Sequence, residues 1–189
     1  MLLAAGKSRR FGISDKLAEP FLGQPIGFHV VTALEAVPFA QRIAVVDGNP
    51  LDYAARGYSM ILNDDPNLGM SRSVSLGVAV ARAAGAESVV IALADMPRVT
   101  ASQIFRLFER AVDAQAVVAS SDGLSPRPPA LFGSDHFDAL EALTGDEGAR
   151  ALIMSGHHVV TMAAELVDID TPEDIVALRV KYGSAGHRE

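Results

Sequence analysis

Short apolar runs alternate with helix-like patterns through the first 119 residues of the chain. The most uniform run, residues 88–94, reads Ser-Val-Val-Ile-Ala-Leu-Ala and fits a strand that is buried on both faces. Strands that alternate with helices are typical of a parallel sheet covered by helices on both sides. We therefore predict a single α/β domain over residues 1–182, a Rossmann-like three-layer sandwich around a mostly parallel sheet. Residues 183–189 are expected to form a disordered tail.

Periodicity, helix-starting residues and turn residues place the individual elements. Strands are expected at residues 1–5, 42–47, 58–62, 88–94 and 116–119, with shorter ones at 130–132, 157–162 and 166–169. Helices are expected over residues 26–37 and 51–56, and further helices begin at Ser71, Thr100, Ser134, Asp146 and Pro172. Three prolines and a glycine predict that residues 120–129 are irregular.

Charge and composition exclude several classes of partner. The chain has 189 residues, a formal net charge of −7 and no cysteine. An acidic protein is a poor partner for nucleic acid, and the lack of cysteine excludes disulfides and cysteine nucleophiles. No apolar run approaches the roughly 20 residues that span a bilayer, and the N-terminus has no signal-peptide pattern. We therefore expect no membrane partner and, by default, a cytoplasmic location.

A basic loop follows the first predicted strand. After Gly6, four of the next ten residues are cationic: Lys7, Arg9, Arg10 and Lys16. Small residues let backbone N–H groups approach an anion and the cations neutralise it, so the loop is a candidate phosphate site. It is not a P-loop, which needs a glycine where Met1 stands, nor a dinucleotide fingerprint, which needs a glycine between Gly6 and Gly12. A surface turn with solvated side chains is the alternative.

Acidic residues end two of the predicted strands. Asp95 follows the most apolar strand, and Asp168 and Asp170 lie on either side of Ile169 in a later one. Alternation along a strand places Asp168 and Asp170 on the same face. A carboxylate is tolerated there if it faces a cleft or binds a cation, and Mg²⁺ prefers oxygen ligands. A Mg²⁺ site is one interpretation; turn formation and helix capping explain these residues equally well.

Polar residues also surround the expected helix start at Ser71. Gly69, Ser71 and Ser73 offer backbone N–H groups and hydroxyls for an anionic or polar ligand, although ordinary capping explains Ser71 equally well. Asn63, at the end of a predicted strand, could hydrogen-bond a nucleobase or close a turn. The five histidines have no metal-ligand spacing, and the serines form no nucleophile elbow.

Five sequence blocks stand in order along residues 2–178. They are Leu3 to Gly12 followed by Asp15-Lys16, Asn63 with Gly69-Met70-Ser71-x-Ser73, Leu93 to Pro97, Gly145-Asp146-x-Gly148-Ala149-Arg150, and Asp168 to Asp174. The first resembles the signature L-A-A-G-x-S-x-R-[MF]-G of the MobA-like nucleotidyltransferase family, and the others agree with it. Within the family the chain is most similar to molybdenum cofactor cytidylyltransferases, because guanylyl-transferring relatives usually have Ala-Gly-Gly where this chain has Ala-Ala-Gly. Arg127 departs from the family, which often has glycine there.

The resemblance implies a fold of the nucleotide-diphospho-sugar transferase type. It implies a Mg²⁺-dependent transfer of CMP from CTP to the phosphate of a molybdopterin-type acceptor, with release of pyrophosphate. A molybdenum hydroxylase that receives the product is a further partner that the resemblance suggests. The implied catalytic residues are Arg10, Lys16 and Asp95, and the implied metal ligands are Asp95 and Asp170. The implied nucleotide-binding residues are Leu3, Ala4, Ala5, Gly6, Lys16, Asn63, Gly69 and Ser71.

Three other functions remain open from the sequence. One is an enzyme of the same fold that uses GTP, or an acceptor such as a sugar phosphate or alditol phosphate. Another is a glycosyltransferase that uses Asp168-x-Asp170 as a metal motif, although the cationic loop suits a triphosphate better than a nucleotide sugar. The third is a non-catalytic accessory protein that binds molybdenum cofactor.

Overall fold

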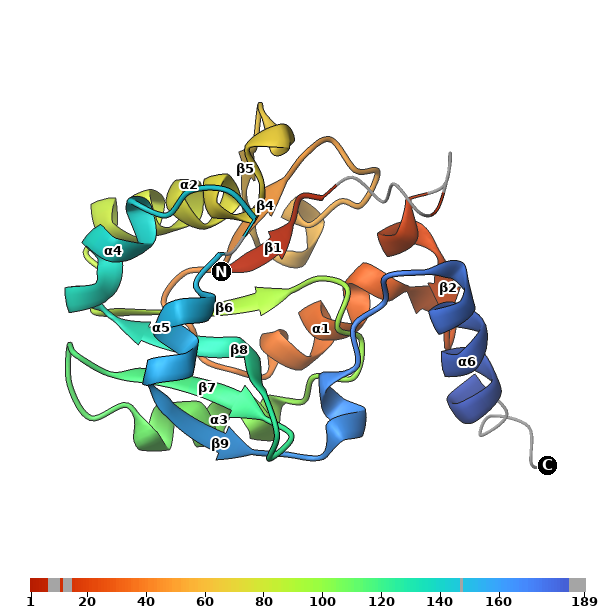
Figure 1. Ribbon diagram of the computed structural model, residues 1–189. Coiled ribbons are helices and arrows are strands. Elements are labelled where there is room, and N and C mark those ends of the chain that lie inside the picture. Colours follow the sequence, from red (N-terminus) through yellow and green to blue (C-terminus); the bar gives the residue numbers. More distant parts are fainter. Residues whose placement is uncertain (7–10, 12–14, 147, 184–189) are drawn as a thin grey trace.

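The computed structural model describes residues 1–6, 11, 15–146 and 148–183. Within these residues the central sheet has seven strands in the order β5-β4-β1-β6-β8-β7-β9 (Figure 1). They are β1 (Leu2–Ala4), β4 (Ile43–Val46), β5 (Ser59–Leu62), β6 (Ser88–Leu93), β7 (Val117–Ser121), β8 (Pro126–Gly133) and β9 (His157–Val160). Neighbouring strands are parallel except where β8 is involved, because β8 runs against both β6 and β7. The prediction of a mostly parallel sheet is confirmed.

Helices cover both faces of this sheet. The helices α1 (Ile26–Glu35) and α3 (Ala101–Arg110) lie on one face, and α2 (Met70–Ala83), α4 (Phe137–Glu141) and α5 (Arg150–Ser155) lie on the other (Figure 1). Short 3₁₀ helices are η2 (Lys16–Ala18), η3 (Ala54–Arg56), η4 (Pro66–Leu68), η5 (Ser134–His136) and η6 (Ala163–Leu166). No helix in the described ranges is both long and apolar enough to cross a membrane. The predicted three-layer sandwich is therefore confirmed.

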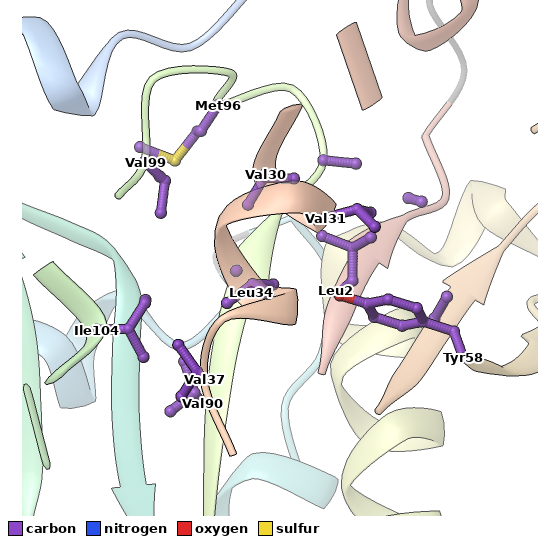
Figure 2. Close-up of a cluster of buried hydrophobic side chains, with 14 of the residues drawn as sticks. Leu2, Val30, Val31, Leu34, Val37, Tyr58, Val90, Met96, Val99 and Ile104 are labelled. Atoms are coloured by element: carbon purple, nitrogen blue, oxygen red, sulfur yellow. The ribbon is translucent and has the colours of Figure 1, made fainter. Parts of the chain in front are cut away.

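Alternation along the strands divides the core into two apolar layers. In β1, Leu2 packs in the layer beneath α1 and α3, whereas Leu3 packs in the layer beneath α2, α4 and α5. In β6, Val90 and Ile91 divide in the same way. Figure 2 shows Leu2 close to Val31 of α1, and Val90 close to Val37, which follows that helix. Burial on both faces is the reason that these strands read as continuous apolar runs.

Two predicted helix starts are confirmed by their caps. The Thr100 hydroxyl accepts a hydrogen bond from the backbone N–H of Gln103 at 3.2 Å, and α3 begins at the next residue. Thr171 and Asp174 form a reciprocal capping box around Pro172, the first residue of α6 (Pro172–Tyr182). That helix lies beside the small sheet of β2 (Pro20–Phe21) and β3 (Gln24–Pro25) (Figure 1). Their shared apolar cluster contains Phe21, Ile26, Ile169, Ile175 and Leu178.

The segment 120–129 forms most of a β-hairpin, so the prediction of an irregular segment was wrong. Strand β7 continues to Ser121 and β8 begins at Pro126, which leaves residues 122–125 as the turn. Proline lacks the N–H that a ladder needs. The hairpin accommodates its prolines because Pro126 is the first residue of its strand and because a register shift leaves Pro128 and Pro129 outside the paired positions.

The predicted strand at residues 166–169 was also wrong. Residues 163–166 form η6, whose start is held by the Glu165 carboxylate, which accepts hydrogen bonds from the Thr161 hydroxyl and the Met162 N–H. The backbone N–H of Ile169 donates to the carbonyl of Asp95 at 3.0 Å, a single contact rather than a ladder. The chain therefore crosses the end of β6 instead of adding a strand to the sheet.

Glycines move three other helix boundaries away from the predicted ones. Helix α2 begins at Met70 rather than Ser71, because Gly69, with a φ of 84°, occupies the N-cap position. Helix α5 begins at Arg150 rather than Asp146, because the backbone has positive φ at Gly145 and Gly148. The predicted helix 51–56 is reduced to η3, which ends at Gly57 with a φ of 80°.

Candidate functional site

Three parallel strands end at the same edge of the sheet, and candidate residues follow each of them. β1 lies between β4 and β6, so Gly6, Asp47 and Asp95 come directly or almost directly after neighbouring strands. Ligands of doubly wound sheets bind outside this carboxyl edge. The edge is therefore the place where a site would be expected from the fold.

The loop after β1 is tied to the end of β4. The Asp47 carboxylate accepts a hydrogen bond from the backbone N–H of Gly6 at 3.0 Å, and the Asn49 amide donates to the carbonyl of Ala4 at 2.8 Å. Ala5 lies between these two anchored residues. These contacts hold the Ala4–Gly6 backbone at the edge of the sheet, where the sequence predicts nucleotide binding.

Lys16 crosses from the start of η2 to the end of β6. Its ammonium Nζ lies 2.6 Å from Oδ2 of Asp95 and donates a hydrogen bond at that distance. It also donates to the backbone carbonyl of Ile169 at 2.8 Å and lies 3.6 Å from Oδ1 of Asp170. Three of the residues predicted to act in one site, namely Lys16, Asp95 and Asp170, are therefore brought together, although Asp170 is far along the chain.

Asp95 keeps one carboxylate oxygen without a partner. Its Oδ1 is buried and has no hydrogen-bond partner among the described residues, and only 19% of the side chain is exposed. Burial raises the pKa of Asp95 above its usual value, Lys16 acts in the opposite direction, and the negative charges of Asp168 and Asp170 raise the pKa further. A buried carboxylate near two other acids favours a bound cation.

The donor set fits Mg²⁺. This hard cation is usually held by one or two carboxylates, with water and substrate phosphate completing its octahedral shell. Asp95 and Asp170 supply carboxylates, and the orphaned Oδ1 of Asp95 supplies a ligand atom that nothing else in the described chain uses. No three side chains of His, Cys, Asp or Glu in the described ranges form a ready metal cluster. Phosphate oxygens and water would therefore have to complete such a site.

The start of α2 is closed by the chain itself. A Cβ on Gly69 would lie 2.4 Å from the carboxylate of Asp146 and 2.5 Å from the carbonyl of Gly145. The backbone N–H of Ser71 donates to that same carbonyl at 3.2 Å, and the Ser71 hydroxyl donates to the Leu68 carbonyl at 3.4 Å. The polar groups of Ser71 are thus directed at protein atoms rather than at a cleft.

Asn63 is likewise turned inward. It is 2% exposed, its amide donates to the Ser73 hydroxyl at 2.9 Å, and its Oδ1 accepts from the backbone N–H of Asp65 at 3.1 Å. The side chain joins the end of β5 to helix α2. In this structure Asn63 and Ser71 hold the fold near the site, and their predicted contacts with a nucleotide remain predictions.

A cavity of about 310 Å³ opens beside the acidic cluster. It lies between the starts of α2 and α5, on the face of the sheet that holds Leu3, and Asp168 forms part of its wall. Its apolar lining comes from Leu3, Met70, Val74, Ile91, Leu93, Met96, Phe132 and Ile153. Its cations are Arg127, at the start of β8, and Arg150, at the start of α5. An apolar cavity with a few charged groups is typical of a small-molecule site.

Some of these residues could not be assigned a role from the sequence. Ile169 contributes a backbone carbonyl, which leaves no side-chain signal, and Arg127 lies in the segment predicted to be irregular. Arg150 lies in the sequence block Gly145 to Arg150 that resembles the family, but the resemblance implied no role for it. Asp47 could have been found from the sequence, since it directly follows an apolar strand. Arg10 lies outside the described residues, so its predicted role stays a prediction.

The sheet order, the reversed β8 and the lysine with its carboxylates define an α/β fold with a charged site at the carboxyl edge of its sheet. The model of the MobA-like NTP transferase domain matches residues 1–160, and the chain belongs to this family. The predicted family is therefore confirmed.

Known relatives span nearly the whole chain. The purine catabolism protein PucB of Bacillus subtilis (strain 168) is 36% identical over 196 residues, covering 95% of this chain and 94% of its own. A molybdenum cofactor guanylyltransferase of Xanthomonas euvesicatoria pv. vesicatoria is 31% identical, covering 92% and 89%. The structure of a nucleotidyl transferase from Methanothermobacter thermautotroptrophicus has a TM-score of 0.80 at 22% identity and covers 98% and 97%, which shows the shared fold.

Proposed function

We propose that this protein is a cytoplasmic, Mg²⁺-dependent nucleotidyltransferase that moves CMP from CTP to the phosphate of a molybdopterin-type acceptor and releases pyrophosphate. The observation that carries the proposal is the cluster of Lys16, Asp95 and Asp170, with one orphaned carboxylate oxygen, beside an apolar cavity. It offers a cation position, a phosphate-binding ammonium and room for an acceptor within one part of the carboxyl edge.

The residues divide the work of phosphoryl-type transfer, which needs positioning and charge neutralisation more than covalent chemistry. Lys16 would bind the triphosphate and, with Arg10, stabilise the charge that develops on the α-phosphate. Asp95 and Asp170 would hold Mg²⁺, which neutralises phosphate oxygens when bound. The acceptor phosphate attacks the α-phosphate in line, its oxygen forms the new P–O bond, and pyrophosphate leaves. No protein nucleophile is required.

The choice of base rests on the first loop. Ala4-Ala5-Gly6 favours CTP, since guanylyl-transferring relatives usually have glycine at the middle position. The Xanthomonas relative is named a guanylyltransferase, so GTP is the competing donor.

The cavity supports a heterocyclic acceptor. Its apolar floor suits a flat ring system, whereas a sugar phosphate or alditol phosphate would leave hydroxyl groups against carbon and lose their hydrogen bonds to water. Arg127 and Arg150 at the same cavity suit an anionic group on that acceptor. A polyol phosphate is therefore the weaker alternative.

A non-catalytic protein that binds molybdenum cofactor and delivers it to a molybdenum hydroxylase is the alternative of another class. It would need the cavity but not the cation cluster. The placement of Lys16 and Asp95 within 2.6 Å of each other favours an enzyme.

Release of pyrophosphate tests the proposal directly. The purified protein is incubated with CTP or GTP, with molybdopterin or an alditol phosphate, and with Mg²⁺ or a chelator. We expect pyrophosphate only with CTP, molybdopterin and Mg²⁺ together. Faster release with GTP would indicate a guanylyltransferase, and faster release with the alditol phosphate would indicate a polyol phosphate as the acceptor. No release with any pair would favour the non-catalytic accessory protein.

A further inference from the structure

The ammonium group of Lys16 lies among the same oxygens that would hold the metal. It is 2.6 Å from Oδ2 of Asp95, 2.8 Å from the carbonyl of Ile169 and 3.6 Å from Oδ1 of Asp170. All three are hard oxygen atoms, the type that Mg²⁺ prefers. Without a nucleotide, the cation position of this cluster is thus filled by a side chain of the chain itself.

We propose that Lys16 is an exchangeable occupant of the metal position, so that metal can enter fully only when a nucleotide triphosphate draws the ammonium away. The inference rests on the proposed metal site and adds an order to it: nucleotide and metal bind cooperatively. It makes Lys16 a positioning residue for the metal in addition to its predicted contact with phosphate.

Charge explains why the position is kept filled. Asp95 is largely buried, and Asp168 and Asp170 lie close enough for their negative charges to act on it. Such a group of acids is costly without a cation nearby. A lysine in the position neutralises part of this charge, and a divalent ion would neutralise more of it.

The two cations compete because they share the carboxylate of Asp95. A divalent ion held by the orphaned Oδ1 would share that group with an ammonium 2.6 Å from Oδ2, so two like charges would lie close together. Either the ammonium moves or the metal binds weakly through the remaining oxygens.

The side chain of Lys16 can move between partners while its backbone stays in place. Lys16 begins η2, whose start is fixed by the Asp15 carboxylate, which accepts a hydrogen bond from the Leu17 N–H at 2.9 Å, and Leu17 is buried. Lysine carries its charge on a flexible four-carbon stem. A triphosphate gives the ammonium a new anionic partner, which lowers the cost of leaving Asp95. By linkage, the metal must then tighten nucleotide binding by the same factor.

Direct metal binding tests this inference without any turnover. Mn²⁺ stands in for Mg²⁺, and free Mn²⁺ is measured by electron paramagnetic resonance with wild type, Lys16→Met, Lys16→Gln and Asp95→Asn. Lys181→Met is the matched control, because Lys181 lies in the last turn of α6, away from the cluster. Circular dichroism checks that each variant is folded, and Lys16→Gln keeps a donor for the Ile169 carbonyl if Lys16→Met is unstable.

Without nucleotide, we expect Lys16→Met and Lys16→Gln to bind Mn²⁺ at least about tenfold more tightly than wild type, and Lys181→Met to match wild type. Addition of α,β-methylene CTP or α,β-methylene GTP, which release no pyrophosphate, should tighten Mn²⁺ binding strongly in wild type and much less in the Lys16 variants. Equal or weaker binding by both Lys16 variants would overturn the inference. If Asp95→Asn binds Mn²⁺ as well as wild type, with and without nucleotide, the proposed metal site itself is wrong.

Discussion

Asp95 and Asn63 occupy similar places and are used in different ways. Each follows a strand of the same sheet, each is predicted to bind a ligand, and each side chain is largely buried. The side-chain amide of Asn63 is fully used, since its nitrogen donates to Ser73 and its oxygen accepts from Asp65. In contrast, Oδ1 of Asp95 has no partner among the described residues. A polar side chain at a strand end therefore indicates function when part of its bonding capacity is left over, and stability when that capacity is used within the fold.

Replacing Asp95 gives the largest expected effect and is the strongest challenge to this comparison. We expect Asp95→Ala to lose about a thousandfold in the rate of pyrophosphate release, because the cation loses its buried ligand. The isosteric Asp95→Asn should melt no lower than wild type, since burial already disfavours the charged form of Asp95. The exposed Asp64→Ala, which removes only a pair with Arg72, is the control. Full activity of Asp95→Ala would contradict the metal assignment.

Arg10 is the second residue with a predicted role in binding the triphosphate, and its replacement should have the next largest effect. We expect Arg10→Ala to lower the rate at least about a hundredfold, by analogy with the loss of one preorganised electrostatic donor. Steady-state kinetics at saturating nucleotide measures this effect, and Lys181→Ala controls for a general loss of positive charge. A rate close to that of wild type would remove Arg10 from the transition state.

Asn63→Ala should show the opposite balance between stability and activity. The change leaves the Ser73 hydroxyl and the Asp65 N–H without their partner, and a lost buried hydrogen bond costs about 1–3 kcal/mol. We expect a loss of unfolding free energy in that range by urea denaturation, with less than about a threefold change in the rate per folded molecule. A double-mutant cycle with Ser73→Ala isolates their contact. A large rise in the KM for nucleotide would return Asn63 to the nucleotide pocket.

His29 gives the smallest expected effect and tests a polar group with no proposed function. Its Nε2 donates to the Phe21 carbonyl at 2.7 Å, and burial lowers its pKa below 6.5. The unfolded chain therefore binds a proton more readily than the native one, so stability is lost as pH falls below about 6.5. We expect Tm to fall less between pH 7 and pH 5.5 in His29→Gln than in wild type, by roughly 1 °C. An equal fall in both would assign the pH response to other groups.

The parts of the fold that follow from local patterns could be predicted, and those set by contacts far along the chain could not. The buried strands and the caps at Thr100 and Thr171 are encoded by neighbouring residues. The β7–β8 hairpin was missed because its prolines are tolerated only through a register shift in a pair of strands. The strand expected at 166–169 failed because a single contact from Ile169 to Asp95 holds that segment across β6.

The same distinction applies to the candidate site. Asp95 could be named from its position at the end of a strand, whereas Asp170 was named from a strand at 166–169 that does not form. The closed start of α2 could not be predicted, because it depends on how closely Gly69 approaches Gly145 across some 75 intervening residues, a contact that chain order alone does not reveal. The orphaned oxygen of Asp95 is a property of the folded surroundings and has no counterpart in the sequence.

The reversed direction of β8 has a consequence for how such a protein can change its acceptor. Because β8 runs against its neighbours, its first residues rather than its last reach the carboxyl edge, and they arrive from the tight turn at residues 122–125. Arg127 belongs to that beginning. Residues inserted at the turn would extend over the cavity while β1, β6 and the Lys16–Asp95 pair kept their positions. The fold thus keeps the part proposed to bind phosphate separate from a turn that can be lengthened or exchanged, which would allow a different acceptor to bind.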